Sequence, residues 1–229
     1  ESLPLLHETS GIRLFHELEL ILAEPKAVMM LDRLDHLNIL KAIHPDLPWS
    51  QEIVDNLKIL NSLEVASKWE LNDESDNQTL RQTLGMIFWL INTPEKSLSE
   101  IASRLRINAK IISCIKKTGN LYHELEILIK AKPSQIYNHL VSYPRLVLFA
   151  VYLIAPTQEQ KKCLETYVEK YANVEPFTNG NDLKALGLEA SPKYSEILKI
   201  LRDGWLDGTL TSAQEEKERL LSLLPKIKN

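Results

Sequence analysis

The sequence has little of what marks secreted, hairpin-rich or disulfide-linked proteins. It carries two cysteines, Cys114 and Cys163, with no pairing pattern or metal-binding spacing around them. Seven glycines in 229 residues leave few positions for tight hairpins. The opening stretch ESLPLLHETS has neither the basic start nor the apolar core of a signal peptide. We therefore expect reduced thiols that pack as small hydrophobes in a cytoplasmic protein.

Long apolar runs are also missing. The longest is RLVLFAVYLIA, between Pro144 and Pro156, and it is far shorter than the roughly 20 residues that cross a bilayer. We expect a buried helix that Pro144 opens and Pro156 ends, because proline lacks the amide that a following turn needs. No membrane partner is expected. Since the chain also lacks an initiator Met, we expect it to be a piece of a longer protein.

Charge is unevenly distributed behind the net value of −4. Residues 1–96 contain 8 basic and 16 acidic side chains, whereas residues 97–145 contain 8 basic and 3 acidic ones. Residues 146–229 are close to balance, with 11 basic and 12 acidic side chains. A phosphate-binding surface is therefore expected in the middle third of the chain.

Helical periodicity dominates the chain, and no segment alternates with a period of two. Ser10 stands at the N-cap position of the helical pattern in SGIRLFHELELILAEP, and Ser50 stands at the N-cap position before QEIVDNLKILNSL. After Tyr171 a turn-rich linker precedes shorter helical segments. We predict an all-α fold, an elongated helical body with a smaller helical C-terminal tail. Its expected regions are 1–71 (neck and body helices), 79–172 (body helices with a basic patch) and 176–229 (tail), with a loop over 72–78.

Catalytic constellations are absent. The six histidines are scattered, and there is no glycine-rich phosphate loop or nucleophile elbow. Asp32 and Asp35 are interpreted as an exposed acidic face, and Asp73, Glu74 and Asp76 as a solvated loop. Tryptophans beside Leu, Ile or Pro at helical spacing are interpreted as core residues. Tyr194, expected in a loop, is retained as a base-stacking residue. We expect no catalysis by this chain alone.

The stretch SLSEIASRLRINAKIISCIKK has the outline of a DNA-reading helix-turn-helix. Two features disfavour that interpretation. Arg106 stands where the turn of such a motif usually has a small residue, and the second helix carries Ile111, Ile112, Cys114 and Ile115 where polar side chains should be exposed. We interpret it as a helical hairpin inside the body and keep DNA binding as an alternative.

Two stretches resemble the bacterial tRNA nucleotidyltransferase and poly(A) polymerase family. The first, SGIRLFHELELILAEPKAVMMLDRLDHLNILKAIHPDL, resembles the segment after that family's catalytic head. The second, NGNDLKALGLEASPKYSEILKILRDGWLDGTLTS, resembles its C-terminal tail. The matching positions of the tail are Gly180, Asp182, Leu183, Leu186, Gly187, Pro192, Ile197, Leu198, Leu206, Asp207 and Gly208. This chain departs from the family at Ile12 and Phe15, where Glu and Arg are frequent, and at Ala190 and Ser191, which replace Pro-Gly in the tail loop.

The resemblance implies a function for the chain. In the family, the head carries an Asp-x-Asp pair that holds two metal ions. Because that pair is absent here, the resemblance implies a non-catalytic portion that binds RNA, most naturally the acceptor stem and elbow of tRNA. It implies no cofactor in this piece, while the parent, through its upstream catalytic head, would use Mg with ATP or CTP.

Phosphate contacts are expected from two sets of basic residues. The first set, in the middle third, is Arg104, Arg106, Lys110, Lys116 and Lys117. The second set, in the tail, is Lys184, Lys193, Lys199 and Arg202. Three functions compete at this point: the RNA-binding portion of a nucleotidyltransferase, a helix-turn-helix DNA-binding module, and a helical protein-interaction scaffold.

Overall fold

The computed structural model describes residues 5–71, 74–75, 78–188 and 192–227. Regular structure in these ranges is helical apart from one pair of two-residue antiparallel strands, β1 (Glu74–Ser75) and β2 (Gln78–Thr79). The all-α prediction is confirmed. Asp73 and Asp76 of the expected loop, and Ala190 and Ser191 of the tail loop, lie outside the described residues. Over the described ranges no helix has both the length and the apolar character needed to span a membrane.

Contacts divide the chain into two compact units. The first comprises Glu1–Glu124 with Tyr143–Gln158, and the second comprises Leu125–Ser142 with Glu159–Asn229. The helix α8 (Ala109–Leu128) begins in the first unit and ends in the second. The sequence-based regions 1–71, 79–172 and 176–229 stay a prediction.

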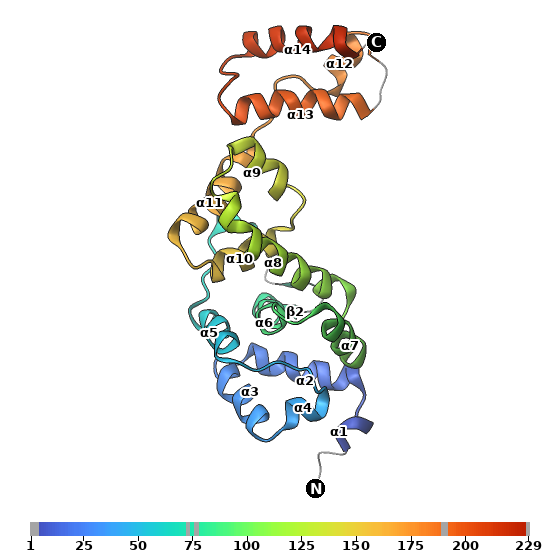
Figure 1. Cartoon of the computed structure of the whole chain (residues 1–229), viewed down its shortest axis with the longest axis vertical. Coiled ribbons are helices and arrows are strands. Elements are labelled where there is room, and N and C mark those ends of the chain that lie inside the picture. The colour runs from blue at the N-terminus through green and yellow to red at the C-terminus, as the bar shows by residue number, and fades with distance from the viewer. Residues whose placement is uncertain (1–4, 72–73, 76–77, 189–191, 228–229) are drawn as a thin grey trace. The chain divides into compact units, whose positions relative to one another are not determined.

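The first unit is a set of helices around α6. Its elements are α1 (Leu5–Glu8), α2 (Gly11–Ala23), α3 (Ala27–His36), α4 (Ile39–Ile43), α5 (Gln51–Ile59), η1 (Leu60–Ser62), η2 (Ser67–Trp69), the strand pair, α6 (Leu80–Leu90), α7 (Glu95–Leu105), most of α8, and α10 (Arg145–Ile154). Every residue of α6 from Thr83 to Leu90 is buried, because α2, α5 and α10 pack around it (Figure 1). This packing accounts for the near-continuous apolar sequence of α6.

Two of the tryptophans in the first unit, Trp69 and Trp89, pack in the core as the sequence predicted, whereas Trp49 is half-buried. Trp69 and Trp89 are fully buried, and the ring of Trp69 lies 5.2 Å from Phe149 and 4.9 Å from Tyr152. Phe149 belongs to the apolar run of α10, which begins after Pro144 and is buried over its centre. The buried-helix prediction for that run is therefore confirmed, and these tryptophans serve the core.

The second unit contains the remaining helices. They are α9 (Pro133–Leu140), α11 (Gln158–Glu169), η3 (Tyr171–Asn173), α12 (Gly180–Ala185), α13 (Pro192–Leu206) and α14 (Ala213–Ile227). α12, α13 and α14 lie together in Figure 1. They share a core of Leu183, Ile197, Leu201, Leu210, Leu220 and Leu223. The other side of α13 packs on α9, where Ser134 donates backbone and hydroxyl hydrogen bonds to Asp207 (2.9 and 2.8 Å) and Asn138 donates to Asp203 (2.8 Å).

Glu216 ties the tail to the linker that precedes it. Only 1% of this residue is exposed. Its carboxylate accepts hydrogen bonds from the amides of Phe177 (3.0 Å) and Thr178 (2.7 Å), from the Thr178 hydroxyl and from the Trp205 indole. Burial raises the pKa of Glu216, but these donors more than offset that effect and hold the pKa below its usual value. The tail thus depends on a buried charge that is satisfied by hydrogen bonds.

Candidate nucleic-acid interface

The predicted helical hairpin is formed by α7 and α8. α7 ends at Arg106, which adopts the left-handed conformation (φ 58°) that reverses the chain. Asn108 then caps α8 by accepting a hydrogen bond from the amide of Ile111 (2.9 Å). The left-handed residue Arg106 and the N-cap Asn108 therefore account for the turn between α7 and α8. Glycine would adopt the conformation of Arg106 at a lower free-energy cost.

The second helix of this hairpin does not have the form of a DNA-recognition helix. Ile111, Cys114 and Ile115 are buried, so the face they form belongs to the core of the first unit. α8 also continues to Leu128 as one 20-residue helix. The interpretation as a hairpin of the body is preferred over the DNA-reading alternative.

Arg104 holds the hairpin to the start of the chain. Its guanidinium donates hydrogen bonds to the carbonyl oxygens of Leu6 (2.7 Å) and Thr9 (3.1 Å). Its own carbonyl oxygen packs so closely on Gly11 that a Cβ there would lie 1.8 Å from it. The motif Ser-Gly-x-Arg-Leu is thereby explained in part: Ser10 caps α2 by accepting from the Arg13 amide, and Gly11 permits the close approach of α7.

The three lysines of α8 lie on two neighbouring faces of the helix, Lys110 and Lys117 on one and Lys116 on the other. Lys110 and Lys117 flank Cys114, at spacings of four and three residues, and their charges act on its thiol. Burial raises the pKa of Cys114 more than the two lysines lower it. Lys116 lies on the neighbouring face and donates a hydrogen bond to the carboxylate of Glu95 in α7 (2.5 Å). Lys110 and Lys116 are exposed and Lys117 is half-buried.

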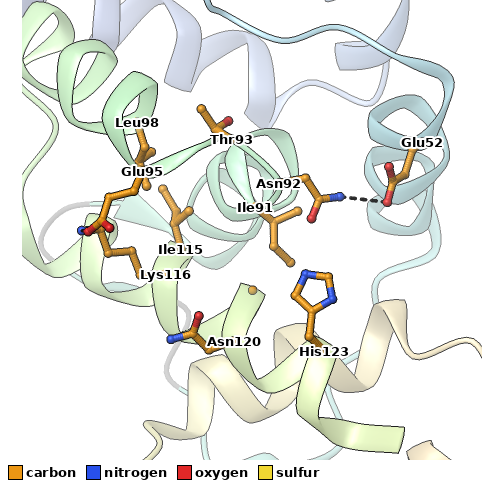
Figure 2. Close-up of a pocket in the computed structure, with 11 residues that line it drawn as sticks. Glu52, Ile91, Asn92, Thr93, Glu95, Leu98, Ile115, Lys116, Asn120 and His123 are labelled. Carbon is orange, nitrogen blue, oxygen red and sulfur yellow. Dashed lines mark hydrogen bonds and ion pairs between the residues drawn. The ribbon is translucent and has the colours of Figure 1, made fainter.

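A groove runs beside the face of α8 that carries Lys116 (Figure 2). It has a volume of about 650 Å³ and is lined by Glu52, Ile91, Asn92, Thr93, Glu95, Leu98, Ile115, Lys116, Gly119, Asn120 and His123. Sequence reasoning selected only Lys116 from this set. The sequence does place three of these residues on one face of the helix 109–128. Lys116, Asn120 and His123 are spaced by four and three residues, and this periodicity is the signal that could have identified them together. The facing wall, Ile91 to Thr93, follows the end of α6. Helical periodicity within 109–128 cannot predict it, because it belongs to a different segment of the chain.

The basic residues of the tail differ in how far they are already engaged. Lys184, in α12, and Lys193 and Lys199, in α13, have exposed side chains. Lys199 pairs with Asp203 at 2.7 Å. Arg202 is half-buried, donates to the Val174 carbonyl (3.1 Å), and stacks 5.0 Å above the ring of Tyr137.

Tyr194 does not occupy the loop in which it was expected. It lies in the first turn of α13, packs against the tail core, and donates its hydroxyl to the Leu188 carbonyl (2.8 Å). Pro192, two residues earlier, begins this helix, so the loop ends before Tyr194. Phe177 is instead the exposed aromatic residue of this region, at 69%, with its ring edge-on to Trp205 (5.5 Å).

The tail positions that carry the family resemblance have structural causes. Gly187 (φ 78°) and Gly208 (φ 70°) end α12 and α13 in the left-handed conformation. Leu183 and Ile197 fill the tail core, and Asp207 accepts from Ser134 of α9. The pattern therefore describes how this small helical module folds and docks within its own unit.

The outer faces of α2 and α3 carry apolar side chains in solvent. Ile12 is 69% exposed and Met29 is 68% exposed, with Leu20, Met30 and Leu37 also exposed. Ile12 is the position at which the resembled family often has Glu. Its side chain and that of Arg13 both face solvent at the start of α2, so this departure replaces a charge on the surface and leaves the core unchanged.

Comparison with known proteins supports the resemblance at both levels of sequence and fold. Residues 1–50 match the family described as "Probable RNA and SrmB-binding site of polymerase A". The A-adding tRNA nucleotidyltransferase of Geobacter sulfurreducens is 24% identical over 92% of this chain, and that of Halalkalibacterium halodurans is 23% identical over 92%. These matches cover 24% and 46% of the two relatives, so the chain spans less than half the length of either.

Solved structures share the fold. The Thermotoga maritima CCA-adding enzyme complexed with tRNA superposes with a TM-score of 0.72 at 20% identity, over 96% of this chain and 53% of that one. A CCA-adding enzyme complexed with CTP gives 0.70 at 20% identity. The chain is therefore similar to the C-terminal body and tail region of the tRNA nucleotidyltransferase and poly(A) polymerase family, as the sequence predicted.

Proposed function

We propose that this chain is the RNA-binding, non-catalytic portion of a tRNA nucleotidyltransferase or poly(A) polymerase, and that it grips the acceptor stem and elbow of a tRNA. The observation that carries the proposal is similarity to the family along nearly the whole chain, combined with a basic surplus confined to residues 97–145. Catalysis in the parent is assigned to an upstream head, which would supply the carboxylates for Mg and select ATP or CTP.

The lysines of both sets are the proposed phosphate contacts. From the first set these are Lys110 and Lys116, which are exposed, and Lys117, which is half-buried, together with Arg106 at the preceding turn. From the second set they are the exposed Lys184, Lys193 and Lys199. An ammonium group on a flexible stem suits this role, because it contacts phosphate as a point charge without a fixed geometry.

Arg104 and Arg202 receive a different role. Both guanidinium groups already donate to backbone carbonyls within their own unit. We assign them to holding the two surfaces in shape, with any phosphate contact secondary. Helical RNA is recognised mainly by its shape and backbone, so the lysines are expected to bind different tRNAs alike.

The test removes the first set of charges. In Lys110→Ala/Lys116→Ala/Lys117→Ala, each lost phosphate contact should lower the slope of log K against log salt by about 0.7–0.9. The triple variant should therefore bind tRNA more weakly at low salt and with a slope reduced by about 2. The matched control is Lys58→Ala/Lys170→Ala/Lys217→Ala, which makes the same change in net charge at exposed positions outside both sets.

An unchanged affinity and slope in the α8 variant would remove these lysines from the RNA surface. Retention of tRNA and of duplex DNA on the same gel tests the DNA-binding alternative. Incubation of the chain with tRNA, CTP, ATP and magnesium should give no extension of the tRNA 3′ end. Extension would overturn the non-catalytic part of the proposal.

A further inference from the structure

The groove beside α8 lies wholly within the first unit. Figure 2 shows the His123 ring pointing from α8 toward Ile91 and Asn92, with Asn120 on the side of Lys116 and Glu95 and with Glu52 on the other side. Gly119 forms part of its base, because a Cβ there would come within 3.2 Å of the Ile91 carbonyl. The volume of about 650 Å³ falls within the range of small-ligand pockets.

The lining combines an apolar floor with polar walls. Ile91, Leu98 and Ile115 are buried and provide the floor. Among the described residues, the Asn120 amide and the His123 ring nitrogens make no hydrogen bond, and the Thr93 hydroxyl oxygen is buried without a partner. The Asn120 amide and the His123 imidazole thus have unused hydrogen-bonding capacity beside an apolar floor.

The charged residues of the groove are engaged but not fixed. Asn92 donates to Glu52 at 2.9 Å, and Lys116 donates to Glu95 at 2.5 Å. Both side chains of the Lys116–Glu95 pair are more than 40% exposed, and such pairs contribute little to stability. Lys116 can therefore exchange the Glu95 carboxylate for a phosphate oxygen at small cost.

We propose that this groove binds an unpaired nucleobase of the RNA that the chain holds. Unpaired bases are recognised by stacking on flat side chains and by hydrogen bonds to their edges. His123 provides the flat ring, Asn120 provides a donor and an acceptor for a base edge, and Lys116, one turn before Asn120 in α8, meets an adjoining phosphate. The proposal rests on the proposed RNA-binding function and adds to it a contact that depends on an unpaired nucleotide.

Alternative ligands fit the lining less well. A metal ion would need several carboxylate or imidazole ligands, and no group of three His, Cys, Asp or Glu able to hold one occurs among the described residues. A free nucleotide offers the same base and phosphate chemistry as RNA. The experiment must therefore separate these two sources.

The variant is Asn120→Ala/His123→Ala, and the control is Ser113→Ala, an exposed position on the same helix that does not line the groove. Binding is measured for two RNAs of equal length, a blunt duplex and a duplex with a single-stranded 3′ extension. The variant should bind the extended RNA at least about 5-fold more weakly, as expected when one stacked base is lost. It should bind the blunt duplex as the unsubstituted chain does, with the same salt slope.

A residue-level readout accompanies the affinities. With 4-thiouridine in the 3′ extension, ultraviolet crosslinks should map to the peptide that contains residues 116–123, and the double variant should lose them. Equal affinities of the variant and the unsubstituted chain for the extended RNA would overturn the groove proposal, even if both bind RNA.

Two further outcomes separate this proposal from the proposed function. Failure of the unsubstituted chain to bind any RNA would overturn both. In a titration with AMP, CMP, GMP and UMP, shifts of the His123 imidazole signals without RNA binding would assign the groove to free nucleotides and overturn its role in RNA binding. Both substituted side chains are exposed, so circular dichroism should show an intact fold.

Discussion

The basic middle stretch and the tail carry similar numbers of cations in different surroundings. Residues 97–145 have 8 basic side chains against 3 acidic ones, whereas residues 176–229 have 8 of each. In the tail, Lys199 faces Asp203 in the next turn. The two regions therefore differ less in how many positive charges they hold than in how much negative charge lies among them.

Each region also commits one arginine to the fold. Arg104 binds the carbonyls of Leu6 and Thr9, and Arg202 binds that of Val174 while lying over Tyr137. Guanidinium suits both sites, because its planar fork satisfies several acceptors at once. Lysines and arginines that share a charge can therefore have separate roles in this chain, and the following substitutions test that separation.

The largest effect is expected where the middle stretch meets α2. Gly11→Ala would put a Cβ 1.8 Å from the Arg104 carbonyl oxygen, so α2 or α7 must move. Overpacking of this kind costs about 3 kcal/mol of unfolding free energy. The tail offers a matched glycine at the same helix position, Gly180, where the nearest atom lies 3.9 Å away. Gly180→Ala should be neutral or slightly stabilising, because alanine favours a helix.

Denaturant unfolding followed by circular dichroism compares the two variants. Equal stabilities for the Gly11 and Gly180 variants would show that the contact between Gly11 and Arg104 does not constrain the first unit. The tRNA affinity of the Gly180 variant should remain unchanged.

An intermediate effect is expected in the tail. Glu216→Gln replaces one acceptor oxygen with an amide that faces N–H and O–H donors, which should cost about 1–3 kcal/mol. Glu218→Gln is the control, because Glu218 lies in the same helix and is exposed. Thermal unfolding measures both. A Glu216 variant as stable as the control would show that the carboxylate is dispensable.

The same residue predicts a pH dependence. The pKa of Glu216 is lower in the folded state than the value of about 4.5 that a glutamate has in the unfolded chain. Its contribution to stability is therefore complete above that value and is lost as the pH falls through the folded-state pKa. Below about pH 4 the unsubstituted chain should lose stability more steeply than Glu216→Gln. Parallel pH profiles would contradict this assignment.

The smallest effects should separate arginine from lysine within the tail. Arg202→Lys keeps the charge but loses the planar contact with Tyr137, and should cost about 1 kcal/mol of stability with tRNA affinity unchanged. Lys184→Ala should leave stability unchanged and lower the salt slope by no more than about 0.9. The reverse pattern, with affinity lost at Arg202 and stability lost at Lys184, would exchange their assigned roles.

Local patterns in the sequence predicted the elements of this fold well. The caps at Ser10 and Ser50 and the proline before α10 act within a few residues of the helices they start, so local sequence reveals them. The charge surplus of residues 97–145 was equally visible. Helical class, buried apolar run and family resemblance all followed from such short-range signals.

Long-range contacts account for what the sequence analysis missed. Glu216 looked like an ordinary acidic first-turn residue, yet it binds Phe177 and Thr178, nearly 40 positions earlier. His123 looked like one of six scattered histidines until the end of α6 was placed opposite it. Arg104 was grouped with the lysines by its charge. Its hydrogen bonds go to the carbonyl oxygens of Leu6 and Thr9, more than 90 positions earlier, and the sequence around Arg104 gives no sign of them.

The conformation of Arg106 sets two selective demands against each other. A non-glycine residue at φ 58° gives up about 1 kcal/mol of conformational free energy. Selection for folding alone would therefore let glycine accumulate at this turn over generations. Under the proposed function, selection for RNA affinity retains the positive charge. Position 106 should accordingly record, in the variation among close relatives, which of the two demands has been stronger in each lineage.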